Sequence, residues 1–262
     1  MAPARSRSLK TLKISPKAIA WIDIAAIAAW GILLLEYWFT QKLSLLIHPS
    51  YNPLSFISGI LLLTIAGYRA WTVVIQSRSK QPLPVVQHLS LLPNGVGSFL
   101  LLGVAIAALF ITPQPFNSTT AIQRGVGDII ASTQVKPQSF RATVKPENRS
   151  LVDWIRTLQV MPEPDTYIGQ KVNVKGFVVH PDNFSPQYFR ITRFIVTCCA
   201  ADAYPISLLV RLSEGDRSLY KPDSWLEVQG TIMVETLSNQ RQIVIQARQL
   251  KPVPQPDRPY DY

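Results

Sequence analysis

The feature that most constrains this chain is a series of three long apolar runs within its first 112 residues. The runs extend from about 18 to 39, from 54 to 75 and from 89 to 111. A transmembrane helix needs about 20 mainly apolar residues, because each residue adds ~1.5 Å toward a hydrocarbon core of ~30 Å. Each run reaches that length. The sequence therefore predicts a membrane domain over residues 1–112 with three transmembrane helices.

The charge distribution supports a membrane protein over a nucleic-acid-binding one. The chain is 47% hydrophobic and only 16% charged, with a net charge of +10. Residues 1–112 hold nine basic and two acidic residues, so most of the basic excess lies beside the apolar runs. Membrane orientation explains that position better than phosphate binding does. We therefore expect membrane lipid, and no nucleic acid, among its partners.

The basic residues also predict the orientation of the chain. Five of them precede the first run, and Arg69 near the far end of the second run is followed by two more before the third, whereas Lys42 is the only one between the first and second. By the positive-inside rule the N-terminus is cytoplasmic, and three spans place the rest of the chain outside. Asp23 and Glu36 interrupt the first run near its ends, and we expect their carboxylates to reach the lipid headgroups.

A tether and a β domain are expected after the third span. Residues 113–149 are polar and turn-rich, which is typical of a tether. Ser150 and Asp153 have the spacing of a capping box before a short amphipathic helix. The β domain is expected over 150–262. Five β-rich stretches follow the short helix: Gln170–Val179, Tyr188–Cys198, Ile206–Leu212, Trp225–Val234 and Arg241–Leu250.

The number and spacing of these stretches predict the fold of the exported part. Five short strands in about 85 residues, with the longer connection 213–224 after the third, fit an OB-like five-stranded small barrel. An open β sandwich has a similar pattern. The predicted fold class is thus a membrane α domain followed by an all-β domain.

The chain has two cysteines, Cys198 and Cys199, which are adjacent. Disulfide bonds between distant segments therefore do not stabilise the predicted fold. If the second strand continues through 199, alternation places Cys198 in the core and Cys199 on the surface. Three interpretations stay open: a buried thiol beside a strand end, a redox pair that forms a strained vicinal disulfide, and a metal or substrate site with Asp202 or His180. A Cys199–His180–Asp202 catalytic set lacks an oxyanion hole and a helix start, so no enzyme is predicted.

Several segments also match a known family. The most specific is the Cys198–Asp202 sequence CCAAD with Arg193-Phe194 upstream. The matching segments are Ile47–Pro49, Tyr167–Gln170, Gly176–Val178, Arg193–Pro205 and Trp225–Gly230. Together they resemble the YcgQ-like family of uncharacterised bacterial membrane proteins.

The resemblance implies a membrane region, a C-terminal β domain and a separate multi-spanning permease that handles metal ions. We therefore expect an accessory subunit of a permease in the bacterial inner membrane, with Arg193, Phe194 and His48 as candidate partner contacts. The alternative is an exported thiol-based redox or metal-binding module without a permease partner. The sequence specifies neither the transported substrate nor a cofactor.

Overall fold

The computed structural model describes residues 15–79, 96–126, 145–182, 184–237 and 239–262 of the chain. These residues fall into two units. Residues up to 43 and from 50 to 113 form the helical unit, and residues 44–49 with those from 114 onward form the β unit. The short segment 44–49 therefore belongs to the β unit although it lies between two helices of the helical unit in sequence.

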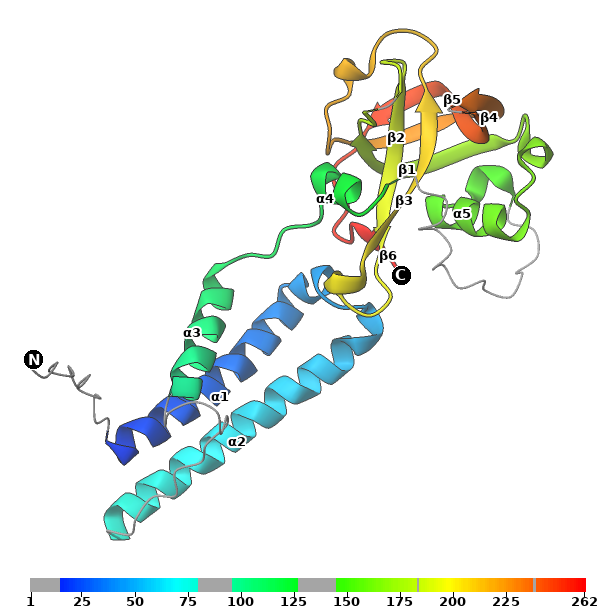
Figure 1. The fold of residues 1–262 in the computed structure, drawn as a ribbon. Coiled ribbons are helices and arrows are strands. Elements are labelled where there is room, and N and C mark those ends of the chain that lie inside the picture. Colours follow the sequence, from blue (N-terminus) through cyan, green and yellow to red (C-terminus); the bar gives the residue numbers. More distant parts are fainter. Residues whose placement is uncertain (1–14, 80–95, 127–144, 183, 238) are drawn as a thin grey trace, which may run out of the picture. The chain divides into compact units, whose positions relative to one another are not determined.

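Three helices make up the helical unit: α1 (Pro16–Phe39), α2 (Asn52–Ser79) and α3 (Val96–Phe110) (Figure 1). Pro16 starts α1, and the Ser15 side chain caps it by accepting a hydrogen bond from the Ala18 N–H. Helix α1 packs against both α2 and α3. Two of the helices, α1 with 24 residues and α2 with 28, are long and apolar enough to cross a membrane.

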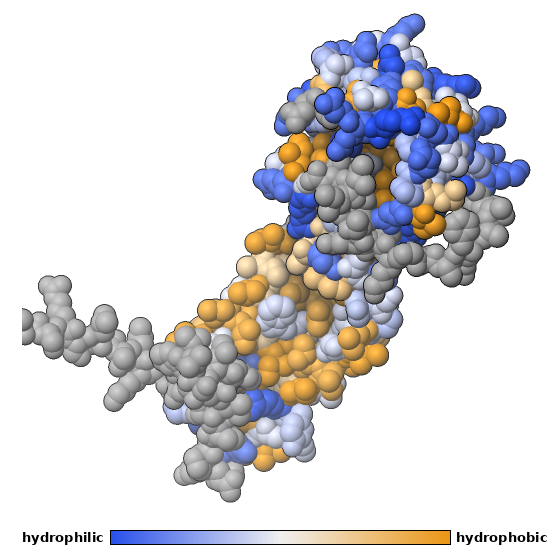
Figure 2. Space-filling view, turned by 45° about the vertical axis from the view of Figure 1, so that its right-hand side comes forward, coloured by the Kyte–Doolittle hydropathy of each residue, from blue (hydrophilic) through white to orange (hydrophobic). Residues whose placement is uncertain are grey.

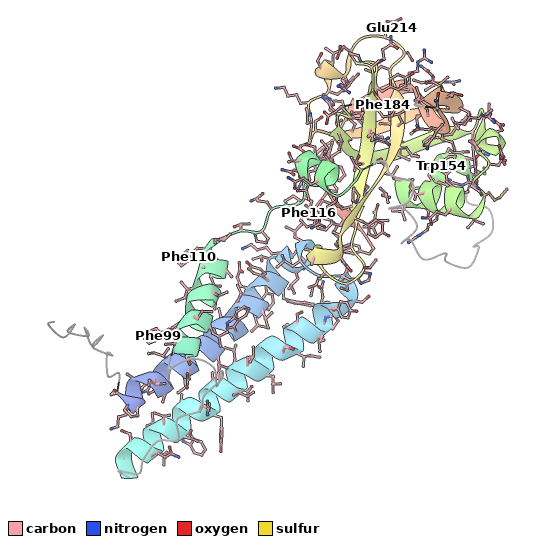
Figure 3. The ribbon with its side chains drawn as sticks, in the orientation of Figure 1. Phe99, Phe110, Phe116, Trp154, Phe184 and Glu214 are labelled. Atoms are coloured by element: carbon pink, nitrogen blue, oxygen red, sulfur yellow. The ribbon has the colours of Figure 1, made fainter. Side chains whose placement is uncertain are left out.

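The third expected span is described only in part. Helix α3 covers 15 residues, and residues 89–95 of the predicted run lie outside the described residues. Hydrophobic residues make up much of the helical unit that Figure 2 shows, and large apolar side chains are exposed on α2 and α3, among them Phe99 and Phe110 of α3 (Figure 3). They include Leu54, Ile57, Leu61, Tyr68, Trp71, Phe99 and Phe110.

Small and polar residues fix the contacts between these helices. A Cβ added at Gly31 of α1 would lie 3.1 Å from the Gly59 carbonyl of α2, so both glycines permit a close approach of the two backbones. The Ser98 hydroxyl of α3 donates to the Asp23 carboxylate, which is buried. Asp23 therefore faces a neighbouring helix, and the expectation that its carboxylate reaches the headgroups was wrong.

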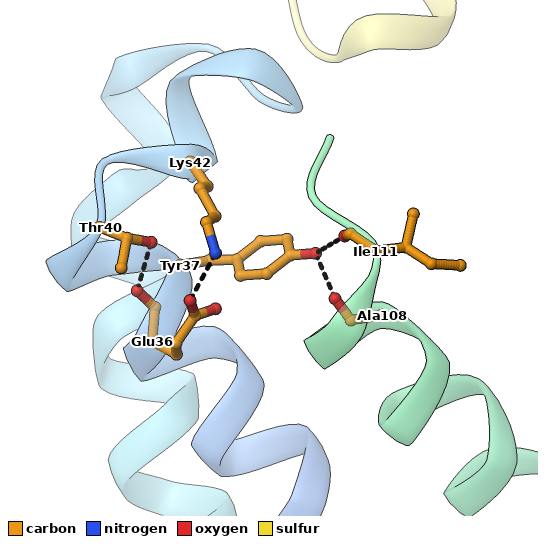
Figure 4. Close-up of polar contacts among 6 residues, drawn as sticks. All are labelled: Glu36, Tyr37, Thr40, Lys42, Ala108 and Ile111. Carbon is orange, nitrogen blue, oxygen red and sulfur yellow. Dashed lines mark hydrogen bonds and ion pairs between the residues drawn. The ribbon is translucent and has the colours of Figure 1, made fainter. Parts of the chain in front are cut away.

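The other end of α1 is tied to α3 by a tyrosine (Figure 4). The Tyr37 hydroxyl lies 2.7 Å from the Ala108 carbonyl oxygen and 3.4 Å from that of Ile111. These carbonyls are at the C-terminal end of α3, where no further helical N–H is available to them. Beside Tyr37, the Glu36 carboxylate pairs with the Lys42 ammonium at 2.6 Å.

The β unit contains a six-stranded mixed sheet (Figure 1). Its order is β1-β4-β5-β3-β2-β6, and β1 also pairs with β2. The β3–β5 and β2–β6 pairs are parallel and the others are antiparallel. The strands are β1 (Lys171–Val179), β2 (Tyr188–Ile195), β3 (Tyr204–Arg211), β4 (Trp225–Leu237), β5 (Gln240–Pro252) and β6 (Tyr260–Asp261).

Strand β1 pairs with two strands, β4 and β2, and a glycine makes the second pairing possible. Residues 171–177 pair with β4, and residues 177–179 pair with β2, so Phe177 belongs to both ladders. Immediately before it, a Cβ added at Gly176 would lie 2.5 Å from the Thr192 carbonyl oxygen. Only glycine leaves room for the backbone of β2 to approach β1 this closely.

Two helices contribute to the cores of the β unit. Helix α5 (Leu151–Val160) has the predicted Ser150–Asp153 capping box and buries Trp154 completely against the sheet (Figure 3). Helix α4 (Ser118–Gln123) places Ala121 in a second core. The short 3-10 helices are η1 (Lys42–Leu45), η2 (Pro49–Tyr51), η4 (Pro146–Asn148), η5 (Pro164–Tyr167), η6 (Ala200–Asp202) and η7 (Arg217–Leu219).

The strand predictions were correct in position and incomplete in extent. All five predicted stretches contain a strand, but β2 ends at Ile195 instead of Cys198, and β6 was not predicted. The β6 segment has only two residues and follows a proline-rich stretch, so it carries no alternating pattern. Residues 114–126 belong to the β unit and include α4, so this part of the predicted tether is ordered structure.

The close approach of the β2 backbone to Gly176 predicts that a side chain at this position destabilises the fold. Gly176→Ala places a methyl group against the backbone oxygen of Thr192, which cannot rotate away, and should reduce the free energy of unfolding by about 1–3 kcal/mol. Thermal unfolding of the purified full-length chain measures this loss. Gly67→Ala is the control, because nothing lies within 4 Å of a Cβ at that helical position. Equal stability of the two variants would contradict the steric role of Gly176.

Candidate functional site

The two cysteines lie in a turn that follows β2 and leads into β3. We call residues 197–203 the thiol turn. Cys198 is exposed and Cys199 is half-buried, so the prediction of a buried Cys198 and an exposed Cys199 was wrong. It assumed that β2 persists through 199, whereas the chain leaves the sheet after Val196, whose N–H donates to the Asp261 carbonyl. Strand alternation therefore does not govern the cysteine side chains.

The carboxylate of Asp202 shapes the thiol turn. It accepts hydrogen bonds from the Cys198 N–H at 2.8 Å, from the Cys199 N–H at 3.1 Å and from the Thr197 hydroxyl. Cys199 is the N-cap residue of η6, and Asp202 is three residues farther on, as in a capping box. These bonds satisfy N–H groups that strand neighbours would otherwise have to satisfy.

This turn brings three potential metal ligands together. The Cys198 and Cys199 Sγ atoms are 3.7 Å apart. Together with a carboxylate oxygen of Asp202 they lie within 4.8 Å of one another. Both thiols are free. Among the described residues, this is the only such group of three or more His, Cys, Asp or Glu side chains.

The hydrogen bonds of the turn set the ionisation of its groups. Burial by itself would raise the pKa of Asp202, but hydrogen bonds from Thr197, Cys198 and Cys199 outweigh it and lower this pKa to about 2. The nearby Asp202 carboxylate is the largest cause that raises the pKa of the Cys198 thiol to about 11, and the contact with the Cys199 thiol adds to it. Without a bound cation, Cys198 is therefore a protonated thiol at neutral pH.

Two distant segments hold the thiol turn in place. Residues 46–48 run antiparallel to it: the His48 N–H donates to the Cys198 carbonyl at 3.0 Å, and the Ala200 N–H donates to the Leu46 carbonyl at 2.7 Å. From the C-terminal end of α4, the Arg124 guanidinium donates to the carbonyls of Ala200 and Ala203. The turn is thus built from residues far apart in the sequence.

His180 does not join the cysteines. It follows β1, where its Nε2 lies 2.8 Å from the Tyr220 carbonyl oxygen. Val179 pairs with Arg190 near the start of β2, whereas Cys198 follows the end of that strand. Arg190 lies five residues before Ile195, the last residue of β2, which is about 16 Å along the strand at ~3.3 Å per residue. The structure therefore brings Asp202, but not His180, to the predicted thiol site.

The candidate partner contacts differ in exposure. Phe194 is fully buried and stacks on Phe177 at 5.9 Å between ring centroids, so it is a core residue and offers no surface to a partner. Arg193 pairs with Asp261 at 3.2 Å and lies over the Trp225 ring. Burial raises the pKa of Asp261, and the positive charge of Arg193 opposes that rise. Arg193 thus has a role inside the β unit.

Sequence reasoning missed three contributors to this site: Thr197, Arg124 and the backbone of residues 46–48. The contact of Asp202 with this turn could have been predicted from the local sequence, because an aspartate three residues after a potential N-cap residue is half of a capping box. Thr197 is adjacent to that pattern and bonds to the same carboxylate. The other two had no local signal, because they reach the turn from segments about 75 and 150 positions earlier in the chain.

Comparison with known proteins identifies the family. The family model of the DUF1980 C-terminal domain matches residues 132–262, which include the thiol turn. The chain therefore belongs to the DUF1980 family, in agreement with its resemblance to YcgQ-like proteins. No curated protein matches it.

The role of Asp202 in the ionisation of Cys198 can be tested. Asp202→Asn removes the negative charge and should lower the pKa of Cys198 from about 11 toward its ordinary value of 9.0. The pH dependence of alkylation, measured by mass spectrometry on the full-length chain, should then shift to lower pH. Asp216→Asn is the matched control, because Asp216 caps η7 in a similar turn without cysteines. An unchanged profile in Asp202→Asn would contradict this account.

Proposed function

We propose that this protein is a membrane-anchored subunit whose thiol turn binds a thiophilic divalent metal ion such as Zn²⁺. The observation that carries the proposal is the geometry of the two sulfurs. Two thiolates bound to one tetrahedral Zn²⁺ at ~2.3 Å lie about 3.8 Å apart. The Cys198 and Cys199 sulfurs are already separated by 3.7 Å. They match this spacing without any change in the backbone.

The composition of the site also favours a metal of this class. Thiolates are soft donors that select Zn²⁺ or Cu⁺, and a carboxylate oxygen is an accepted third donor for Zn²⁺. The ionised Asp202 would also offset the charge of the cation. Metal binding displaces the thiol protons to solvent, so the raised pKa of Cys198 makes the affinity increase with pH.

A thiol–disulfide role is the second candidate, because the two sulfurs are adjacent and free. In that role the dithiol would reduce a partner disulfide and itself become a vicinal disulfide, with two protons and two electrons passing to the partner. Attack requires a thiolate, and the pKa of Cys198 at about 11 opposes its formation. A metal cation instead deprotonates its thiol ligand directly. The site therefore favours metal binding.

We also propose that the β unit is an OB-like barrel. Strand pairings run from β1 through β4, β5, β3 and β2, and the β1–β2 pairing returns to the first strand. This order, with a parallel β3–β5 pair, supports a small closed barrel rather than a β sandwich. Strand β6 would then be an addition at the edge of β2.

We further propose that the chain spans the bacterial inner membrane three times and that the β unit lies on the extracytoplasmic side. Its support is the length and composition of α1 and α2, the exposed apolar residues of α3, and the basic residues before α1 and after α2. The role of accessory subunit to a multi-spanning, metal-transporting permease rests on the YcgQ-like resemblance. A thiophilic metal site outside the cytoplasm fits that role, because it would present the ion on one side of the transporter.

Metal binding is tested with Co²⁺, whose thiolate complexes absorb in the near ultraviolet and visible range. The purified full-length chain should bind Co²⁺ with a thiolate-to-cobalt charge-transfer band, and Zn²⁺ should displace it. Cys198→Ser or Cys199→Ser should weaken binding at least about tenfold, because each removes a ligand. Asp216→Asn should bind as the wild type does. A wild-type chain without the band would refute the metal site.

Membrane topology is tested by reporter fusions. Fusions after Lys17 and after Arg78 should report the cytoplasm, and a fusion after Pro115 should report the extracytoplasmic side, because three spans separate it from the N-terminus. Enzyme reporters that are active on opposite sides of the membrane provide the measurement. A cytoplasmic signal at Pro115 would remove the third span and, with it, the exported location of the β unit.

A further inference from the structure

The contact between residues 46–48 and the thiol turn points to another metal ligand. Ile47 and Cys199 form an antiparallel bridge, flanked by the hydrogen bonds from His48 to Cys198 and from Ala200 to Leu46. In this pattern Ile47 and Cys199 are directly opposite in a pair without mutual hydrogen bonds. His48 is therefore the residue opposite Cys198.

The register places His48 directly beside Cys198. Directly opposite residues of an antiparallel pair have Cβ atoms about 4.5–5.5 Å apart, which is within the reach of an imidazole. The His48 ring is now edge-to-face on the Tyr262 ring, at 5.2 Å between centroids. In that rotamer its nitrogens lie outside the compact group of Cys198, Cys199 and Asp202. Rotation about the Cα–Cβ bond moves the ring by several ångströms without any change in the paired backbone.

We propose that His48 is the fourth ligand of the metal site, which deepens and rests on the proposed function. A closed Zn²⁺ site takes four ligands, and the thiol turn provides three. The backbone hydrogen bond to Cys198 holds His48 beside the site, and its imidazole completes a Cys₂-Asp-His set. The imidazole leaves the Tyr262 ring when the metal binds.

This assignment gives the segment 44–49 a function. The Tyr262 hydroxyl donates to the Ser44 carbonyl at 2.9 Å, and Leu45 packs against the core that contains Phe194 and Trp225. These contacts fix the segment within the β unit independently of the metal. Since residues 44–49 join α1 to α2 in the chain, a metal-bound His48 places one ligand of the site in the connection between two apolar helices.

The test compares Co²⁺ binding by full-length variants. His48→Ala should keep the thiolate-to-cobalt charge-transfer band, because both cysteines remain. Its affinity should fall at least about tenfold, and its visible d–d bands should shift, because water replaces a nitrogen ligand. His180→Ala is the matched control and should behave as the wild type, because that ring contacts the Tyr220 carbonyl instead.

Tyr262→Leu separates ligation from packing. It removes the ring on which His48 rests and the hydrogen bond to Ser44 but keeps the imidazole, so it should retain the d–d bands of the wild type. An equal loss of affinity in Tyr262→Leu and His48→Ala, with unshifted d–d bands in both, would overturn the assignment. So would a His48→Ala chain that matches the wild type in affinity and spectrum. A wild type without the charge-transfer band would instead defeat the proposed metal site itself, and this inference with it.

Discussion

The double pairing of β1 is the constraint on which the β unit depends. Its residues 171–177 belong to the β4 ladder and its residues 177–179 to the β2 ladder. Gly176 makes this possible because the Thr192 carbonyl occupies the space where a Cβ would lie. The position of β2 then follows, and with it the point at which the chain leaves the sheet after Val196 and enters the thiol turn.

Within the thiol turn, one carboxylate determines the chemistry of the site. Asp202 accepts hydrogen bonds from Thr197, Cys198 and Cys199, which shape the turn, and its carboxylate raises the pKa of the Cys198 thiol. The same negative charge that keeps Cys198 protonated attracts a cation. A protonated Cys198 thiol beside an ionised carboxylate is a poor nucleophile and a good precursor of a thiolate–metal site.

The surroundings of the turn connect this chemistry to the rest of the chain. Arg124 and the backbone of Leu46 and His48 satisfy carbonyl and N–H groups of the turn that would otherwise face solvent or remain unpaired. Leu46 and His48 lie between α1 and α2 in sequence. The site in the β unit thus includes a part of the chain that is preceded and followed in sequence by apolar helices.

The sequence by itself determined the elements whose signals are local. The apolar runs gave α1 and α2, the spacing of Ser150 and Asp153 gave the capped start of α5, and alternation gave the positions of five strands. The adjacency of Cys198 and Cys199 marked the site. Only the tertiary structure decided that β2 ends before the cysteines, that Asp202 joins them while His180 does not, and that residues 46–48 lie alongside. The physical reason is that periodicity reports which side of a segment is buried, whereas the partner of each N–H and carboxylate depends on segments that only folding brings together.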